Sequence, residues 1–330
     1  MASPKNILIT GGSGFLGPML AAKLLQDQDT SYNVVLTDLQ TPPQPANIPS
    51  SAPLTLTPAD LTLPSDISRL LALRPTWHAI FLFHGIMSVG CEENPALSTR
   101  VNIDATTAVL SAIAALTQPE KPRIVYASTQ AVYGPPYTAS GPITDDTPAT
   151  PLGVYGTHKL IIESHINDLH RRGLIDAFAL RLPTVTVRPG APSRSAAAWI
   201  SGIVREPMAG LECEIPVEDR DSRQMICSPR VMIENFVRVM RAPSEVMPAH
   251  VRAVYMPGIS VTLGDMYDAV ERVCGAEKVK LLRTVRNEEF ERLLASWPRT
   301  AEFGNARRMG LVFDESCEQV FREYVEGLKV

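Results

Sequence analysis

The chain has 330 residues and a formal net charge of −4, with 45% hydrophobic and 20% charged residues. Lysine and arginine are dispersed along it, which excludes an extended basic surface for nucleic acid. No stretch reaches the roughly 18 apolar residues that span a bilayer, and the start enters a strand without a signal-peptide apolar region. We therefore expect a cytoplasmic protein without a membrane partner, long enough to bury a large core.

The cysteines show no pattern typical of a disulfide framework or a metal site. There are five of them, scattered along the chain, and no Cys-x-x-Cys pair occurs. We therefore predict reduced thiols and no metal.

The first predicted strand, residues 5–10, runs directly into a glycine-rich turn and then a helix. The turn reads Gly11-Gly12-Ser13-Gly14-Phe15-Leu16-Gly17. Its glycines let backbone amides approach a pyrophosphate, and the helix aims its N-terminal amides at the same group. A second strand, residues 33–37, ends at Asp38, whose carboxylate can accept hydrogen bonds from ribose hydroxyls. This order predicts a dinucleotide site, and Asp38 favours NAD because it would repel the 2′-phosphate of NADP.

Strand and helix patterns alternate through the rest of the chain after a Pro-, Thr- and Ser-rich loop at residues 41–53. The predicted strands are 54–56, 79–83, 123–127, 177–182 and 252–256. The predicted helices are 65–73, 95–116, 151–172, 196–203, 231–240, 263–273 and 287–295. This alternation indicates an α/β fold with a doubly wound parallel sheet of the Rossmann type.

Two pairs of side chains in the middle of the chain suit alcohol oxidation. Tyr155 and Lys159 share one face of the predicted helix 151–172, and Ser128 and Thr129 end the preceding strand, where open sheets bind ligands. Because the pKa of tyrosine is about 10, Tyr155 needs a nearby cation to act as a base. We expect Lys159 to supply that charge and to hydrogen-bond the nicotinamide ribose. Tyr155 would then take the hydroxyl proton while Ser128 or Thr129 holds the substrate oxygen.

Four motifs carry a family resemblance. They are Thr10-Gly11-x-x-Gly14-x-x-Gly17, Asp60-Leu61, Ser128-Thr129-x-x-Val132-Tyr133-Gly134 and Tyr155-x-x-x-Lys159. In this order they resemble the extended short-chain dehydrogenase/reductase family, the group of nucleotide-sugar epimerases and dehydratases. The resemblance implies that Thr129 is the catalytic hydroxyl. It also implies further cofactor contacts, namely Phe15 and Leu16 in the turn, Asp60 and Leu61 at the adenine, His84 beneath the cofactor, Asn102 in a kinked helix and Pro183 near the nicotinamide.

The resemblance also implies a domain organisation and an oligomeric state. Residues 1–182 would form the NAD-binding domain, with 223–257 contributing to it. Residues 183–222 and 258–330 would form a smaller C-terminal α/β substrate domain. A homodimer is expected through the helices within 94–116 and 151–172.

Several stretches of the second half narrow the resemblance. They are residues 171–176, 181–190, 201–207 and 255–258, and they are similar to the D-erythronate dehydrogenase subgroup. Enzymes of that subgroup use NAD to oxidise the 2-hydroxyl of a four-carbon sugar acid. Residues 84–87 and the Pro-rich loop depart from the wider family pattern near the pocket, which leaves the substrate open.

An acidic substrate needs a cation, and Arg223 and Arg188 are the candidates. Arg223 stands where sugar-nucleotide epimerases carry a phosphate-binding arginine, and a planar guanidinium holds a carboxylate through two parallel hydrogen bonds. Its alternative role is an internal ion pair with Glu218, Asp219 or Asp221. Thr184 is a further candidate substrate contact.

The sequence thus predicts an NAD-dependent oxidoreductase that acts on a small sugar acid, with Tyr155 as the base. One alternative is a sugar epimerase or dehydratase that recycles NAD within each turnover. Another is a dinucleotide sensor without catalysis, against which the intact Thr129, Tyr155 and Lys159 argue.

Overall fold

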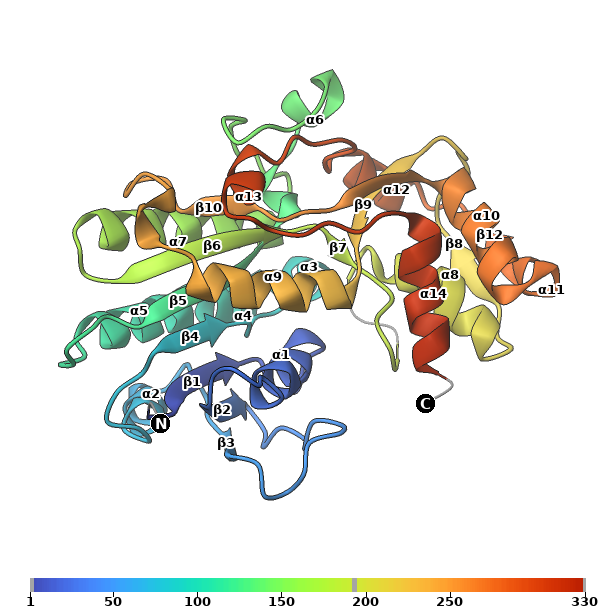
Figure 1. The fold of residues 1–330 in the computed structure, drawn as a ribbon. Coiled ribbons are helices and arrows are strands. Elements are labelled where there is room, and N and C mark those ends of the chain that lie inside the picture. Colours follow the sequence, from blue (N-terminus) through green and yellow to red (C-terminus); the bar gives the residue numbers. More distant parts are fainter. Residues whose placement is uncertain (1–2, 192–194, 329–330) are drawn as a thin grey trace.

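A seven-stranded parallel sheet forms the centre of the molecule in the computed structural model, which describes residues 3–191 and 195–328 (Figure 1). The sheet order is β10-β6-β5-β4-β1-β2-β3. The strands are β1 (Lys5–Thr10), β2 (Tyr32–Asp38), β3 (Leu54–Pro58), β4 (Ala79–Leu82), β5 (Arg123–Thr129), β6 (Asp176–Leu182) and β10 (Ala253–Tyr255). The order reverses between β1 and β4, which opens a crevice at the carboxyl ends of these strands. The predicted Rossmann-type fold is confirmed.

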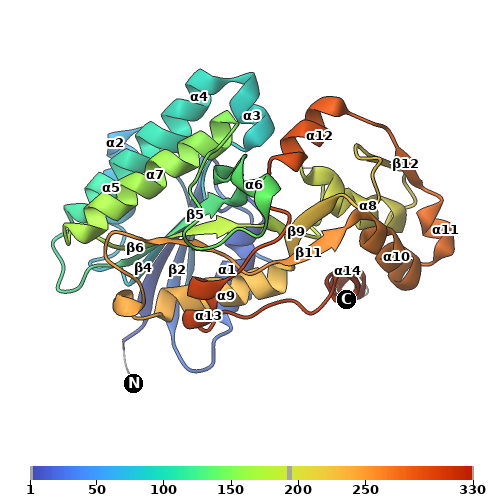
Figure 2. The same cartoon turned by 90° about the horizontal axis from the view of Figure 1, so that it is seen from above.

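Helices cover both faces of the sheet (Figure 2). One face carries α1 (Leu16–Leu25) and α9 (Pro229–Arg241), and the other carries α2 (Pro64–Leu71), α5 (Thr106–Ala114) and α7 (Val154–Arg171). Because neither face meets water, the central strand β4 is buried at every position.

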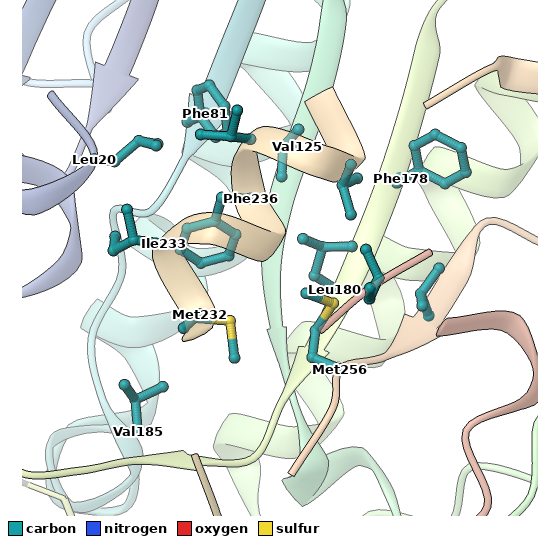
Figure 3. Close-up of a cluster of buried hydrophobic side chains, with 14 of the residues drawn as sticks. Leu20, Phe81, Val125, Phe178, Leu180, Val185, Met232, Ile233, Phe236 and Met256 are labelled. Atoms are coloured by element: carbon teal, nitrogen blue, oxygen red, sulfur yellow. The ribbon is translucent and has the colours of Figure 1, made fainter. Parts of the chain in front are cut away.

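Side chains of the strands alternate between two cores. Phe81 of β4 packs with Met232, Ile233 and Phe236 of α9 on one face (Figure 3). Its neighbour Ile80 points to the opposite core, which α2, α5 and α7 complete. Strands β1, β2, β4, β5 and β6 each contribute side chains to both layers of apolar packing, which fixes their carboxyl ends at the crevice.

Two smaller sheets lie beyond the carboxyl ends of β5 and β6 (Figure 1). One has the order β11-β9-β7, and the other pairs β12 with β8. Their strands are β7 (Thr184–Val185), β8 (Cys213–Ile215), β9 (Arg223–Cys227), β11 (Ile259–Thr262) and β12 (Leu282–Thr284). Helices α8 (Ala198–Met208), α10 (Leu263–Cys274) and α14 (Cys317–Gly327) pack with them around a separate hydrophobic core.

The chain crosses between these cores more than once. Phe303, Ala306 and Leu311 return to the core of the main sheet, although they follow the last strand of the smaller sheets. Met225 and Cys227 of β9 also pack into that core. The division into domains at residues 182, 222 and 257 stays a prediction.

The helix expected over residues 95–116 is helical from Pro95 to Ala114 and contains one wider turn. It consists of α4 (Pro95–Thr99), a π-helical turn (Arg100–Ala105) and α5. Asn102 lies in the π-helical turn, where its Oδ1 accepts from the Ile86 amide at 2.7 Å and its Nδ2 donates to the Ile86 carbonyl at 3.0 Å. These bonds tie the wide turn to the segment after β4, which accounts for the local change in helical winding.

The remaining helices are short, apart from the eight-residue α12. They are α3 (Ser88–Glu93), α6 (Tyr137–Ser140), α11 (Ala276–Val279), α12 (Glu288–Ala295) and α13 (Gly304–Arg308), with 3₁₀ turns at Gln130–Val132 and Ser244–Val246. Within the described ranges, no helix is both long and apolar enough to cross a bilayer.

Candidate active site

A cavity of about 1290 Å³ runs along the carboxyl edge of the main sheet and ends against the smaller sheets. Most residues singled out from the sequence line it: Gly11, Gly14, Phe15, Leu16, Gly17, Asp38, Asp60, Leu61, His84, Ser128, Thr129, Tyr155, Lys159, Pro183, Thr184 and Arg188. Two do not, Asn102 and Arg223. The fold thus gathers residues from most of the chain at the crevice where doubly wound sheets bind ligands.

Two glycines of the turn, Gly11 and Gly17, lie where a side chain would have no room. Gly11 has a φ of +72°, and a Cβ there would lie 2.7 Å from the carbonyl carbon of Phe83. A Cβ on Gly17 would lie 2.9 Å from the carbonyl oxygen of Gly11, which lets α1 start close against the turn. This bare backbone at a helix N-terminus fits the pyrophosphate of a dinucleotide.

Asp38, at the end of β2, accepts hydrogen bonds from the glycine turn and from its own neighbour. Its Oδ2 accepts from the Ser13 amide at 2.8 Å, and its Oδ1 accepts from the Leu39 amide at 2.7 Å. Each carboxylate oxygen keeps a lone pair for a ribose hydroxyl, as the adenosine end of NAD requires. Asp60 and Leu61, which follow β3, line the same end of the cavity.

His84 is held as a neutral ring at the floor of the cavity. One ring nitrogen lies 2.8 Å from Thr10 Oγ1 and the other lies 3.1 Å from Thr106 Oγ1. Loss of contact with water and, to a smaller extent, the charge of Lys159 lower the pKa of His84 to about 3. A ring that stays uncharged can link β1, β4 and α5 without the cost of a buried positive charge.

Tyr155 and Lys159 lie one helical turn apart on α7, as predicted from their spacing. The Lys159 ammonium donates to the Ala127 carbonyl at 2.7 Å and lies 5.6 Å from the centre of the Tyr155 ring. Burial lowers the pKa of Lys159 to about 8. Burial raises the pKa of Tyr155, and the opposing positive charge comes from Arg188.

Arg188 and Arg223 occupy different environments. Arg188 is partly buried, lines the cavity, and places its guanidinium carbon 5.9 Å from the centre of the Phe15 ring. In the described part of the chain no carboxylate pairs with it, and its Nε donates to the Val185 carbonyl at 3.3 Å. Arg223 is exposed at the start of β9, outside the cavity, where it donates to Ser260 Oγ at 3.5 Å. The alternative ion pair of Arg223 with a nearby acid is likewise not formed among the described residues.

Some cavity residues had no sequence signal. Gln130, Trp297 and, from the Pro-rich loop, Pro45 and Asn47 also line the cavity. Trp297 follows α12 in a segment without any motif, so only the fold brings it there.

This combination of fold and site is that of an NAD-dependent oxidoreductase. Residues 7–247 match the NAD dependent epimerase/dehydratase family, and the chain belongs to that family. The residues of the glycine cradle and Asp38 are those that would hold the cofactor.

Relatives of known activity agree with this assignment. The chain is 30% identical to a D-erythronate dehydrogenase of Haemophilus influenzae, over 97% of this chain and 99% of that protein. It is 32% identical to a D-erythronate dehydrogenase of Cupriavidus necator, over 97% of this chain and 98% of that protein. These relatives and the family together identify an NAD-dependent dehydrogenase, as predicted.

Solved structures share the fold. A structure described as a nucleoside-diphosphate-sugar epimerase from Agrobacterium tumefaciens superposes with a TM-score of 0.88 at 31% identity, covering 98% of this chain and 94% of that one. An L-threonine dehydrogenase from Cupriavidus necator superposes with a TM-score of 0.83 at 19% identity, covering 98% of this chain and 100% of that one. At 19% identity the second likeness concerns the fold alone.

Proposed function

We propose that this dehydrogenase oxidises the 2-hydroxyl of a small sugar acid of the D-erythronate type and forms the 2-oxo acid. Two relatives that match nearly the whole chain carry the name D-erythronate dehydrogenase. Their identity to this chain, 30% and 32%, supports a shared reaction and leaves the acid itself to be tested.

The observation that carries the proposal is the guanidinium of Arg188 at the wall of the cavity. It is partly buried and has no carboxylate partner among the described residues, although a desolvated charge is normally paired. The Arg205 guanidinium approaches it and helps burial to lower its pKa. A substrate carboxylate would supply the missing negative charge. In this proposal Arg188 takes the carboxylate-binding role that the sequence had favoured for Arg223.

Tyr155 is the proposed base. Because burial raises its pKa, the phenol needs a nearby positive charge before it can lose its proton. Arg188 supplies one such charge, and in this proposal Lys159, 5.6 Å from the ring centre, supplies a second. Bound NAD supplies the hydride acceptor. Tyr155 then takes the proton of the substrate hydroxyl.

Thr129 is the proposed partner of the substrate oxygen. Its Oγ1 accepts from the Ala131 amide at 3.1 Å, so the hydroxyl proton stays available on the cavity side. A hydrogen bond from Thr129 would hold the reacting oxygen near the Tyr155 phenol, and such positioning is a large part of catalysis.

A homodimer is part of the proposal. Leu97, Leu152 and Ile161 are exposed on the segments expected to form its interface. Burial of such side chains against a second copy would remove apolar surface from water. Sedimentation of the wild-type protein and of a Leu97→Glu, Ile161→Glu variant would test this, with a dimer expected for the first and a monomer for the second.

The reaction is tested with a panel of four- to six-carbon sugar acids and their reduced alcohols, each with NAD, by following the absorbance of NADH. We expect net NADH formation from acids with a 2-hydroxyl and little from the alcohols. Conversion of a neutral sugar or a sugar nucleotide without net NADH would instead support the epimerase alternative.

A further inference from the structure

A series of buried hydrogen bonds runs from the main sheet to Thr184, at the end of the cavity where the substrate is proposed to bind. The Tyr255 hydroxyl donates to Oε1 of Gln130 at 3.0 Å, and Nε2 of Gln130 donates to Oγ1 of Thr184 at 3.2 Å. The exposed fractions of these residues are only 3%, 4% and 8%. Tyr255 ends β10, Gln130 begins the turn after β5, and Thr184 begins β7.

The Tyr255 hydroxyl determines which atom donates in each of these two hydrogen bonds. In the described part of the chain, Gln130 is the only hydrogen-bond partner of the Tyr255 hydroxyl. Burial also raises the pKa of Tyr255 well above its usual value, so the phenol remains protonated and must donate. If the Gln130 amide were reversed, the phenol proton would be buried without an acceptor, at a cost of about 1–3 kcal/mol.

With the Gln130 amide in this orientation, the Thr184 hydroxyl is left as a hydrogen-bond donor. Its oxygen accepts the proton of Gln130 Nε2, so its own hydroxyl proton must go elsewhere. No described residue accepts that proton, and the Thr184 side chain lines the cavity. Thr184 therefore presents a hydrogen-bond donor to whatever fills this end.

The Arg188 guanidinium provides further hydrogen-bond donors near the Thr184 hydroxyl. Thr184 and Arg188 both line a recess of about 10 Å³ beside the cavity, and Ser201 and Arg205 are among its other lining residues. Arg205 is already paired with Glu206. A site made of a guanidinium and a hydroxyl that can only donate suits a group that only accepts, and a carboxylate is such a group.

We infer that Tyr255 and Gln130 fix Thr184 as a hydrogen-bond donor to the substrate carboxylate, so that these residues and Arg188 select acids over alcohols and over amines. This inference rests on the proposed function. In it Thr184 contacts the substrate, whereas Gln130 and Tyr255 are positioning residues. Through these hydrogen bonds the Tyr255-Met256-Pro257-Gly258 stretch would act on substrate choice, although it does not itself line the cavity.

The test measures binding to the NAD-loaded enzyme by calorimetry, with two probes that lack the hydroxyl proposed to be oxidised. In both, the carbon next to the carboxylate, or next to the alcohol carbon that replaces it, carries no hydroxyl. One is 3,4-dihydroxybutanoate, and the other is butane-1,2,4-triol, the same molecule with its carboxylate reduced. Thr184→Val should weaken binding of the acid about 10- to 100-fold, as expected for a hydrogen bond to a charged group, and should change binding of the triol by less than about threefold. Thr184→Ser should restore binding of the acid.

Tyr255→Phe tests the positioning role. Without the phenol proton the Gln130 amide is free to turn, so the ratio of acid to triol affinity should fall about 3- to 10-fold. Tyr133→Phe is the matched control, because Tyr133 packs on Tyr255 with ring centres 5.4 Å apart but bonds Arg181 instead of Gln130. It should leave the ratio unchanged.

The outcomes separate this inference from the proposed function. If the wild-type enzyme binds the acid no better than the triol, both are overturned. If it prefers the acid and Thr184→Val retains that preference, only the inference is overturned. An equal effect of Tyr255→Phe and Tyr133→Phe on the ratio would also overturn it, because the phenols would then act only through packing.

Discussion

The hydroxyl of Ser128 donates its hydrogen bond to the buried carboxylate of Glu163 and not to the cavity that Ser128 lines. Glu163 is 1% exposed and also pairs with Arg181, whose Nη2 lies 2.6 Å from Oε2. The Ser128 proton is therefore used inside the protein, whereas the Thr129 proton is not. Of the two hydroxyls that the sequence places at the end of β5, the structure leaves Thr129 free to act on a substrate.

The two hydroxyls should respond differently to removal. We expect Thr129→Val to lower kcat/KM by about 10²-fold, because the contact to the reacting oxygen is lost. Ser128→Ala should keep most of the activity and lower the free energy of unfolding by about 1–3 kcal/mol, since the Glu163 carboxylate loses a buried partner. Steady-state kinetics and urea unfolding would measure both. A larger catalytic loss from Ser128→Ala than from Thr129→Val would reverse the assignment.

The Tyr155→Phe variant should lose most of its turnover, whereas its affinity for NAD should stay nearly unchanged. Removal of a group that transfers a proton commonly lowers kcat by roughly 10²- to 10⁴-fold. The glycine turn and Asp38 are unchanged in this variant, so the dissociation constant of NAD, measured by calorimetry, should stay within about threefold. A near-normal kcat would exclude the phenol as the base and point to another group in the cavity.

Asp38 should determine the choice between NAD and NADP. Asp38→Asn keeps an oxygen for the Ser13 amide and removes the charge that opposes a 2′-phosphate. We expect the ratio of kcat/KM for NADP to that for NAD to rise about tenfold, as removal of one like-charge contact at a partly solvated site allows. Asp60→Asn, at the same end of the cavity, is the control and should leave the ratio nearly unchanged. A wild-type preference for NADP would refute the role given to Asp38.

Local sequence patterns were enough to predict which residues gather in the cavity as candidates for cofactor binding. The glycine turn, Asp38 and the Tyr155–Lys159 spacing are each encoded within one strand–turn–helix or one helical turn, so short stretches of sequence predict them. A smaller α/β part was expected, but its individual strands were not predicted, because β7, β8 and β12 have only two or three residues each, too few for a periodic pattern.

Contacts between distant segments could not be predicted in the same way. Tyr255 and Gln130 are 125 residues apart, and only the packing of β10 beside β6 brings them together. Arg223 was favoured over Arg188 because of its place in a motif. Its side chain lies outside the cavity because β9 pairs with β11 in a register that sets Arg223 opposite Thr262 at the exposed end of the sheet.

The neutral state of His84 should appear in the pH dependence of stability. Its pKa is about 3 in the folded protein, against about 6.5 for a free histidine, so between these values the unfolded state binds more protons. The stability contributed by the neutral ring is therefore complete above about pH 6.5 and is lost as the pH falls toward 3. We expect His84→Gln, whose amide cannot be protonated, to be less stable than wild type at pH 7.5. The gap in melting temperature should narrow by pH 4.5, and a gap independent of pH would contradict this.

The two arginines provide the sharpest test of an acidic substrate, because each can be changed in the same way. Arg188→Lys keeps a positive charge and removes the planar pair of donors that a carboxylate prefers. We expect KM for the sugar acid to rise by about tenfold or more, while kcat and the melting temperature change little.

Arg223→Lys is the matched control, since Arg223 is exposed and lies outside the cavity. It should leave KM for the acid within about twofold, because a change at an exposed surface charge rarely exceeds 0.5 kcal/mol or so. The effect of Arg188→Lys should also vanish for an analogue whose carboxylate is reduced to an alcohol, because the alcohol makes no charged pair to lose. If Arg188→Lys weakens acid and alcohol equally, Arg188 serves the fold of the pocket. If Arg223→Lys is the variant that loses the acid, the segment carrying Arg223 must close over the cavity during the reaction, and the carboxylate site lies there instead.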